Sequence, residues 1–213
     1  MHEARRSRFL VLWLVLSVAL VYAETVRFPL VWDDGKILEF AQARADAQGL
    51  GSLFLTNFQM GLESPYSSPY YRPVIYLSFL FDAWLGKVIG VPVFHATNIL
   101  LHALSTVFVF LLLRELVGNL PGAFIGALFF SLHPVHAEAV AWVSGRADLL
   151  STLLALISFL LWLRSRDHQA RHRLLLLCAG SISFFVGGLT KESVVLLPLF
   201  LLLHDLVASR WAG

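Results

Sequence analysis

The chain has little charge and almost no cysteine. Only 14% of its 213 residues are charged, against about 25% in an ordinary soluble domain, while 58% are hydrophobic. The single cysteine, Cys178, excludes an internal disulfide framework and a zinc site built on paired cysteines. A net charge of only +2, with no basic cluster interleaved with aromatic residues, argues against nucleic-acid binding. The sequence also lacks a glycine-rich phosphate loop, so no nucleotide-sugar site is expected. The high hydrophobic content and the low charge therefore indicate an integral membrane protein.

Long apolar runs predict an all-α membrane protein with about six transmembrane helices. The runs cover residues 9–23, 93–113, 121–133, 148–163, 174–189 and 193–207. Arg5, Arg6 and Arg8 precede the first run, and arginine-rich short segments stay in the cytoplasm, so both termini are placed there. The first run could also be a cleavable signal peptide ending at Ala23; we favour a retained span.

The layout is supported by where the basic residues fall. The short segments assigned to the cytoplasmic side hold Arg5, Arg6, Arg8, Arg114, Arg164, Arg166, Arg171, Arg173 and Arg210. The other basic residues are spread over far longer outer segments, as the positive-inside rule requires.

Residues 24–92 are predicted to form a long first outer loop that contains interfacial helices. A helical segment is expected within 35–61, followed by a turn-rich segment at 63–69. The apolar stretch 74–89 carries Asp82, Trp84 and Lys87, which favours a helix lying in the membrane interface. The alternative for this stretch is a second full span.

Two adjacent acids, Asp33 and Asp34, follow Trp32 just beyond the first apolar run. A carboxylate held partly out of water is a suitable general base for a hydroxyl nucleophile. Two neighbouring acids can also divide roles, one as base and one orienting a partner. The alternative is a solvated loop in which Asp34 caps a helix that starts at Gly35.

Other polar residues are predicted to lie at the same outer rim. Arg72, Arg146 and Lys191 could hold a phosphate, or could simply pair with acids such as Asp148 and Glu192. His136 and Glu138 could hold a divalent metal, although their spacing is not that of a standard zinc site. The alternative for these histidines is interfacial hydrogen bonding.

A polar stripe runs along the predicted span 93–113. It consists of His95, Asn98, His102 and Ser105, which recur at helical spacing and therefore share one face. This face should point at other helices or at a cavity rather than at lipid. A substrate groove and an interhelical hydrogen-bonded seam explain it equally well.

Several short motifs occur in a specific order between residues 28 and 205. They are Trp32-Asp33-Asp34, Tyr71-Arg72-Pro73-Val74, Phe94-His95-x-x-Asn98-x-x-Leu101-His102, His133-Pro134-Val135-His136-x-Glu138, Gly145-Arg146-Ala147-Asp148 and Lys191-Glu192-Ser193. In combination they resemble the transmembrane O-mannosyltransferases that act on cadherins and their bacterial relatives with tetratricopeptide repeats. That family belongs to the GT-C superfamily of polyprenyl-phosphate-sugar-dependent enzymes.

The resemblance implies a role for each matching residue. Asp33 takes the place of the catalytic base, and Asp34 assists it or contacts the acceptor or a metal. Glu138 matches the acid at the end of the third span. We assign the donor phosphate to Arg72, Arg146 and Lys191, with His95 and His102 as further substrate-binding candidates. The chain departs from the family in having fewer spans and no repeat domain, so residues 1–213 are expected to be a single GT-C-like domain, the N-terminal part of a longer enzyme.

The expected activity is transfer of a sugar, mannose by resemblance, from a polyprenyl-phosphate donor to a hydroxyl of a protein or glycan acceptor. The reaction is expected on the outer or lumenal face, with a divalent metal as a candidate cofactor and no nucleic acid as partner. The bacterial cytoplasmic membrane is the favoured location, or the endoplasmic reticulum in a eukaryote. The alternatives are a transporter or flippase of lipid-linked substrates, which should carry polar residues at the midplane, and an inactive truncated membrane partner.

Overall fold

A computed structural model of the chain describes residues 2–57, 70–166 and 172–211, and all regular structure within these ranges is helical. The turn-rich segment predicted at 63–69 lies outside them. The elements in chain order are α1 (His2–Tyr22), η1 (Ala23–Arg27), α2 (Asp34–Gln48), η2 (Leu50–Leu55), α3 (Pro73–Ile89), α4 (Phe94–Val117), α5 (Leu120–Leu132), η3 (Pro134–His136), α6 (Ala137–Ala141), η4 (Val143–Gly145), α7 (Arg146–Ser165), α8 (Arg173–Gly188), η5 (Glu192–Leu196) and α9 (Leu197–Trp211).

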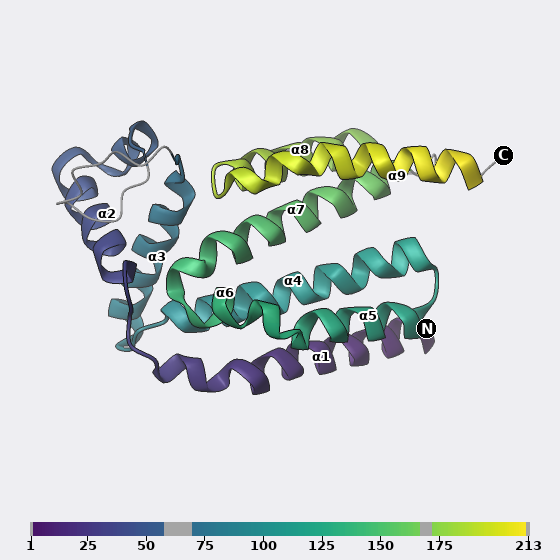
Figure 1. Cartoon of the computed structure of the whole chain (residues 1–213), viewed down its shortest axis with the longest axis horizontal. Helices are drawn as coiled ribbons and strands as arrows, with labels where there is room; N and C mark the ends of the chain where they lie inside the picture. Colours follow the sequence, from purple (N-terminus) through teal and green to yellow (C-terminus); the bar gives the residue numbers. More distant parts are fainter. Residues whose placement is uncertain (1, 58–69, 167–171, 212–213) are drawn as a thin grey trace.

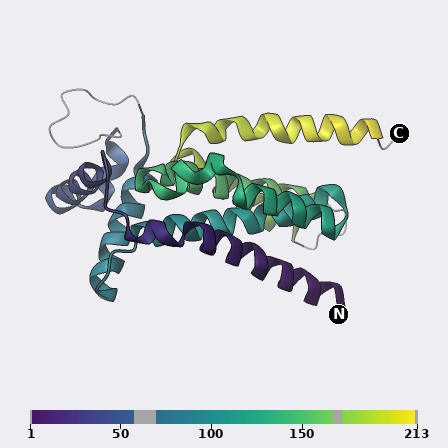
Figure 2. The same cartoon turned by 60° about the horizontal axis from the view of Figure 1, so that its bottom comes forward.

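The helices form a bundle with a cap at one end. Helices α1, α4, α5, α7 and α8 pack against one another along a common axis, and α9 runs in the same direction (Figure 1). Elements α2, η2 and α3 form the cap, and α3 runs across the bundle axis rather than along it (Figure 2). Both termini lie at the opposite end of the bundle from the cap.

Within the residues that the structure describes, three helical segments are long and apolar enough to cross a membrane: Glu3–Arg27, Phe94–Val117 and Val143–Ser165. A fourth span results if Leu120–Leu132 and Pro134–Ala141, which are bent by 45° at a short break, count as one. Helices α8 and α9 have 16 and 15 residues, whereas a span needs about 20. The chain is thus an all-helical integral membrane protein, as predicted, and the count of six spans stays a prediction.

The cap has its own apolar core, which continues into the bundle. Ile37, Phe40, Leu53, Tyr76 and Phe79 are buried together within the cap, and the same cluster includes Phe94, Val143 and Ala147. The first helix is part of the bundle core as well, since Leu14 and Val18 of α1 are fully buried. The cap and the bundle are therefore continuous rather than loosely tethered.

The turn between α4 and α5 follows the chemistry of its residues. Gly118 adopts a left-handed φ of 72°, which glycine reaches without a Cβ clash, and so ends α4. Asn119 then caps α5, because its side-chain oxygen accepts the Gly122 amide at 2.7 Å. The turn lies between the apolar runs 93–113 and 121–133, which the sequence predicts as two separate helices.

Candidate active site

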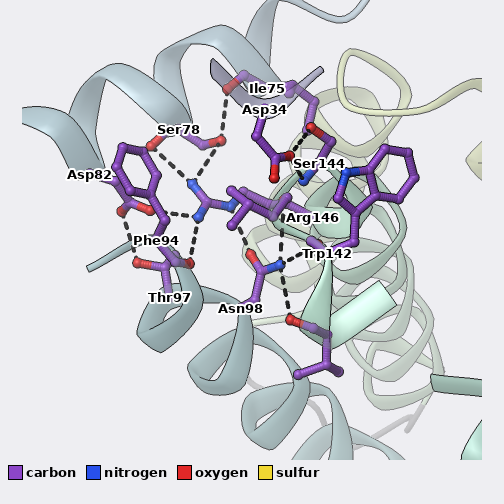
Figure 3. Close-up of polar contacts among 12 residues, drawn as sticks. Asp34, Ile75, Ser78, Asp82, Phe94, Thr97, Asn98, Trp142, Ser144 and Arg146 are labelled. Carbon is purple, nitrogen blue, oxygen red and sulfur yellow. Dashed lines mark hydrogen bonds and ion pairs between the residues drawn. The ribbon is translucent and has the colours of Figure 1, made fainter. Parts of the chain in front are cut away.

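Asp34 joins the segment that carries the acid pair, Asp33 and Asp34, to the bundle. The Asp34 side chain is fully buried, and its Oδ1 accepts hydrogen bonds from the backbone amide (2.8 Å) and the hydroxyl (2.5 Å) of Ser144 (Figure 3). Its Oδ2 accepts the Val31 amide at 3.0 Å. The alternative of a solvated helix cap at Asp34 is therefore wrong. Asp34 connects the start of α2 to η4 through buried hydrogen bonds.

Asp33 is half-buried and less fully engaged. It precedes α2 but makes no side-chain capping bond, and its buried Oδ1 has no hydrogen-bond partner among the described residues. Burial raises the pKa of Asp33 above its ordinary value, and the negative charge of Asp34 adds to the rise, while hydrogen bonds from its own backbone and from the Ser144 side chain partly oppose it. Asp33 is thus a carboxyl group with a raised pKa and one oxygen that has no partner among the described residues.

Trp32 gives this segment its unusual shape. Its φ of 53° is left-handed, a conformation that costs a side-chain-bearing residue about 1–3 kcal/mol. The ring remains largely exposed and makes an edge contact with Trp142 at a centroid distance of 5.3 Å. Trp142 in turn has a buried indole Nε1 with no partner among the described residues. The strain and the unpartnered donor both lie beside the acid pair, where strained backbone is commonly functional.

Arg146, the first residue of α7, lies at the centre of a buried network that joins α3, α4 and α7 (Figure 3). Its Nη2 forms an ion pair with Asp82 at 2.5 Å, and both side chains are fully buried. Its Nε donates to Asn98 (2.9 Å), and its Nη atoms donate to the carbonyls of Phe94 (2.8 Å) and Ser78 (3.2 Å). The whole guanidinium is committed to protein groups, which leaves no exposed atom for a donor phosphate.

Asn98 links the Arg146 network to the hydrogen bonds between Ser144 and Asp34. Its Nδ2 donates to the Trp142 carbonyl at 3.0 Å, within reach also of three neighbouring carbonyls of α6 and η4. The turn it closes carries Ser144, the partner of Asp34. The path Arg146–Asn98–Trp142–Ser144–Asp34 thus fixes the position of the acid pair against the bundle.

The polar stripe of α4 faces the bundle interior, as predicted. His95, Asn98, His102 and Ser105 are all buried. His95 packs edge-on against Phe28, and the Nε2 of His102 lies 3.1 Å from the Ser131 carbonyl. Of the two interpretations open from the sequence, the geometry matches the interhelical seam.

Arg72 and Lys191 meet at the cap end of the bundle. Arg72 donates to Glu192 through Nε (3.2 Å) and Nη2 (2.6 Å), and Lys191 forms an ion pair with Asp148. The cations are mostly covered, at 15% and 24% exposed, whereas Glu192 and Asp148 are 54% and 55% exposed. The hydrogen bonds from Arg72 are the main reason that the pKa of Glu192 lies below its ordinary value. The predicted pairing with acids is confirmed for both cations.

An apolar groove starts beside this cluster. It has a volume of about 380 Å³ and runs between α4, α7, η5 and α9, with Leu156, Phe159, Val194 and Phe200 among its walls. Its polar members include Ser151 and Ser193. The Ser151 hydroxyl donates to the backbone carbonyl of Asp148 at 3.2 Å, so the groove adjoins the Lys191–Asp148 ion pair.

The predicted metal ligands do not converge. Glu138 is exposed on α6, while the His136 ring packs against Phe130 and His102 at centroid distances of 4.4 and 5.0 Å. No three potential ligands are grouped anywhere in 2–57, 70–166 and 172–211. The geometry of these ranges thus gives the predicted metal site no support.

Two important residues were missed by the sequence reasoning. Asp82 was interpreted as an interfacial charge, but it is the buried partner of Arg146. A lone acid in an apolar helix is itself a signal, because such a charge needs a buried cation. Ser144 offered no signal, since its role depends on the backbone turn that brings it to Asp34.

The chain is similar to several proteins of known family. It is 34% identical over 205 residues to the protein O-mannosyl-transferase TMTC1 of Mus musculus, which covers 88% of this chain and 21% of that protein. It is 36% identical over 151 residues to human TMTC1 (70% and 17%) and 31% identical over 200 residues to Tmtc2 of Drosophila melanogaster (90% and 21%). No family model and no solved structure matches it.

The chain spans about a fifth of the length of these relatives. The matches to the mouse and Drosophila proteins cover 88% and 90% of this chain. The resemblance that the ordered motifs predict is thereby confirmed: the chain is a membrane protein that resembles the protein O-mannosyl-transferases of the TMTC family.

Proposed function

We propose that the chain carries the base and the donor site of a protein O-mannosyltransferase that uses a polyprenyl-phosphate sugar at the outer membrane face. Its relatives are named protein O-mannosyl-transferases, which supports transfer of mannose to a protein hydroxyl. The observation that carries the proposal is Asp33, a half-buried carboxyl group with raised pKa and an unpartnered oxygen among the described residues.

Asp33 is the proposed general base. As the acceptor hydroxyl attacks the anomeric carbon of mannose, its proton passes to Asp33 and a new carbon–oxygen bond forms. The bond between the anomeric carbon and the phosphate oxygen breaks, and its electron pair leaves on the polyprenyl phosphate. A base with a raised pKa is suited to this step, because it binds the proton more strongly than an ordinary aspartate.

Arg72 and Lys191 are the proposed donor-phosphate residues. They are the mostly covered members of two ion pairs whose acids are exposed, so an incoming phosphate can replace the acid partners at little cost. The adjoining 380 Å³ groove offers an apolar surface for the polyprenyl chain. The negative charge that develops on the leaving phosphate would then lie beside two fixed cations.

The other predicted site residues take different roles in this proposal. Asp34 and Arg146 position the acid pair through Ser144 and Asn98 rather than touching substrate. His95 and His102 pack the helices, in keeping with their burial. No step is assigned to a metal at Glu138 or His136.

The test is a transfer assay in membranes that contain the chain, supplied with labelled polyprenyl-phosphate mannose and an acceptor polypeptide. The Asp33→Asn variant should lose at least 100-fold in transfer rate, the usual size of a general-base contribution. The matched control is Glu39→Gln, which removes one exposed carboxylate from α2 and should transfer normally. Equal transfer by Asp33→Asn and the intact chain would refute the base assignment, and no transfer by the intact chain would favour the transporter or the inactive partner.

A further inference from the structure

A cavity of about 560 Å³ lies between α1 and α5. The start of α1 and the start of α5, which line it, lie at the end of the bundle that carries the termini (Figure 1). It is lined by Arg5, Arg6, Phe9 and Leu10 of α1 and by Leu120, Pro121 and Phe124 of α5. Its volume falls within the range of about 300–1,000 Å³ that is typical of small-molecule sites. It is at the opposite end of the bundle from Asp33 and plays no part in the proposed transfer reaction.

The cavity changes in polarity with depth. Arg5 and Phe9 are four residues apart on α1, as are Arg6 and Leu10, so each arginine lies one helical turn nearer the membrane surface than an apolar residue on the same face. On α5, Pro121 lies at the start of the helix and Phe124 one turn deeper. The result is a site with a cationic rim and an apolar interior, which matches an amphiphile that stands upright in one leaflet.

The rim charges have no acidic counterpart. Neither Arg5 nor Arg6 forms an ion pair with any residue in the described ranges, and no carboxylate is among the lining residues. Neighbouring arginines at this end are engaged: Arg164 pairs with Glu115, and Arg114 donates to the Ser7 hydroxyl. The two cations of the cavity are therefore available for an anion.

The apolar wall is part of a packed core rather than a mobile edge. Leu10, Leu120 and Phe124 pack against the buried cluster of Leu14, Phe110, Ala123 and Ala127. The alanines let α1, α4 and α5 approach closely, as small residues do between membrane helices. The cavity thus has a fixed shape on its inner side.

We propose that this cavity binds an anionic glycerophospholipid of the cytoplasmic leaflet. Its phosphodiester lies between the guanidinium groups of Arg5 and Arg6, which suit phosphate geometry. One acyl chain lies along Phe9, Leu10 and Phe124. The arginine-rich end of the chain is the cytoplasmic end by the positive-inside rule, and basic pockets between helices on that side recognise anionic headgroups.

Native mass spectrometry of the purified, delipidated chain tests this. We expect one tightly bound dioleoyl-phosphatidylglycerol per chain, with at least tenfold preference over dioleoyl-phosphatidylcholine. Each arginine near a membrane surface contributes about fivefold to the binding of anionic lipid, so Arg5→Gln/Arg6→Gln should weaken phosphatidylglycerol binding about 30-fold and leave phosphatidylcholine unchanged. Arg5→Lys/Arg6→Lys keeps the charge but loses the planar fork, and should weaken binding by a few-fold.

The matched control is Arg8→Gln/Arg173→Gln, which removes two charges from the same end of the bundle but outside the cavity. It should bind phosphatidylglycerol like the unaltered chain. Equal weakening by the control and by Arg5→Gln/Arg6→Gln would overturn the site, since it would show attraction by overall charge. Competition by glycerol phosphate at equal concentration would overturn the lipid assignment in favour of a soluble phosphate ligand.

Discussion

The buried ion pair between Arg146 and Asp82 allows a quantitative prediction. Replacement of Arg146 by Met removes the ion pair together with donors to Asn98, Phe94 and Ser78. Among the described residues, Asp82 then keeps the Thr97 hydroxyl, at 2.8 Å, as its one donor. Breaking a buried pair from one side costs about 3–5 kcal/mol, because the remaining charge is buried without compensation. We expect Arg146→Met to destabilise the fold by about 4 kcal/mol.

The double substitution separates the pair from its surroundings. Asp82→Leu alone leaves a buried cation and should cost about 3 kcal/mol, whereas Asp82→Leu/Arg146→Met leaves no charge and should cost well below the sum of the two. The expected coupling free energy is about 2 kcal/mol. Arg146→Lys should be intermediate, because it keeps the charge but loses the forked donors.

The measurement is reversible unfolding of the chain in mixed micelles of a mild and a denaturing detergent, followed by tryptophan fluorescence. Trp142 lies in the turn that Asn98 closes and should report loss of this network. A control is Arg164→Met, which breaks an exposed pair with Glu115 and should change stability by less than about 1 kcal/mol. Strict additivity of the Asp82 and Arg146 substitutions would refute the conclusion that this pair holds the cap to the bundle.

Three further predictions concern the acid pair and its surroundings. Because the pKa of Asp33 is raised above its ordinary 3.8, the base becomes protonated at a pH above 3.8, and the acid limb of kcat/KM should lie above pH 3.8 as well. Asp34→Asn removes a negative neighbour and should move this limb to lower pH, as a pH–rate profile would show. Ser144→Ala removes one donor to Asp34, so it should destabilise the fold by about 1–2 kcal/mol in detergent unfolding and slow transfer in the transfer assay. Unchanged transfer would exclude a positioning role for Ser144. Trp32→Gly and Trp32→Ala both lose the contact with Trp142, but only glycine relieves the strain of the left-handed φ of 53°. The glycine variant should therefore be about 1 kcal/mol more stable than the alanine variant in detergent unfolding. The reverse order would show that the backbone there is not strained.

The sequence was informative wherever the physics is local. Apolar runs predicted most helix positions, and helical spacing predicted the buried stripe of α4. The break between the runs 93–113 and 121–133 is where α4 ends and α5 begins. The conjunction of Arg72 and Lys191 at one rim was also predictable, because topology alone brings span ends together. The acid pair was singled out by its chemistry.

What could not be predicted depends on contacts between distant segments. Arg146 looked like a phosphate ligand because its partner Asp82 belongs to a helix whose packing the sequence does not reveal. The burial of Asp34 likewise depends on Ser144, which is 110 residues away. The number of spans depends on α8 and α9, which are apolar but have only 16 and 15 residues. A helix shorter than the bilayer can still cross it where the membrane thins, so helix length does not set the number of spans.

The separation between Asp34 and Ser144 has a consequence for biogenesis. A chain is synthesised from its N-terminus, so Asp34 leaves the ribosome 110 residues before the group that clamps it. The carboxylate of Asp82 likewise waits for Arg146 before its charge can be neutralised. The cap is therefore expected to remain at the hydrated surface during insertion of α4 and α5, and to dock only when the start of α7 emerges. Ribosome-bound chains that end within α6 should accordingly expose α3 to protease, whereas chains that extend beyond α7 should protect it.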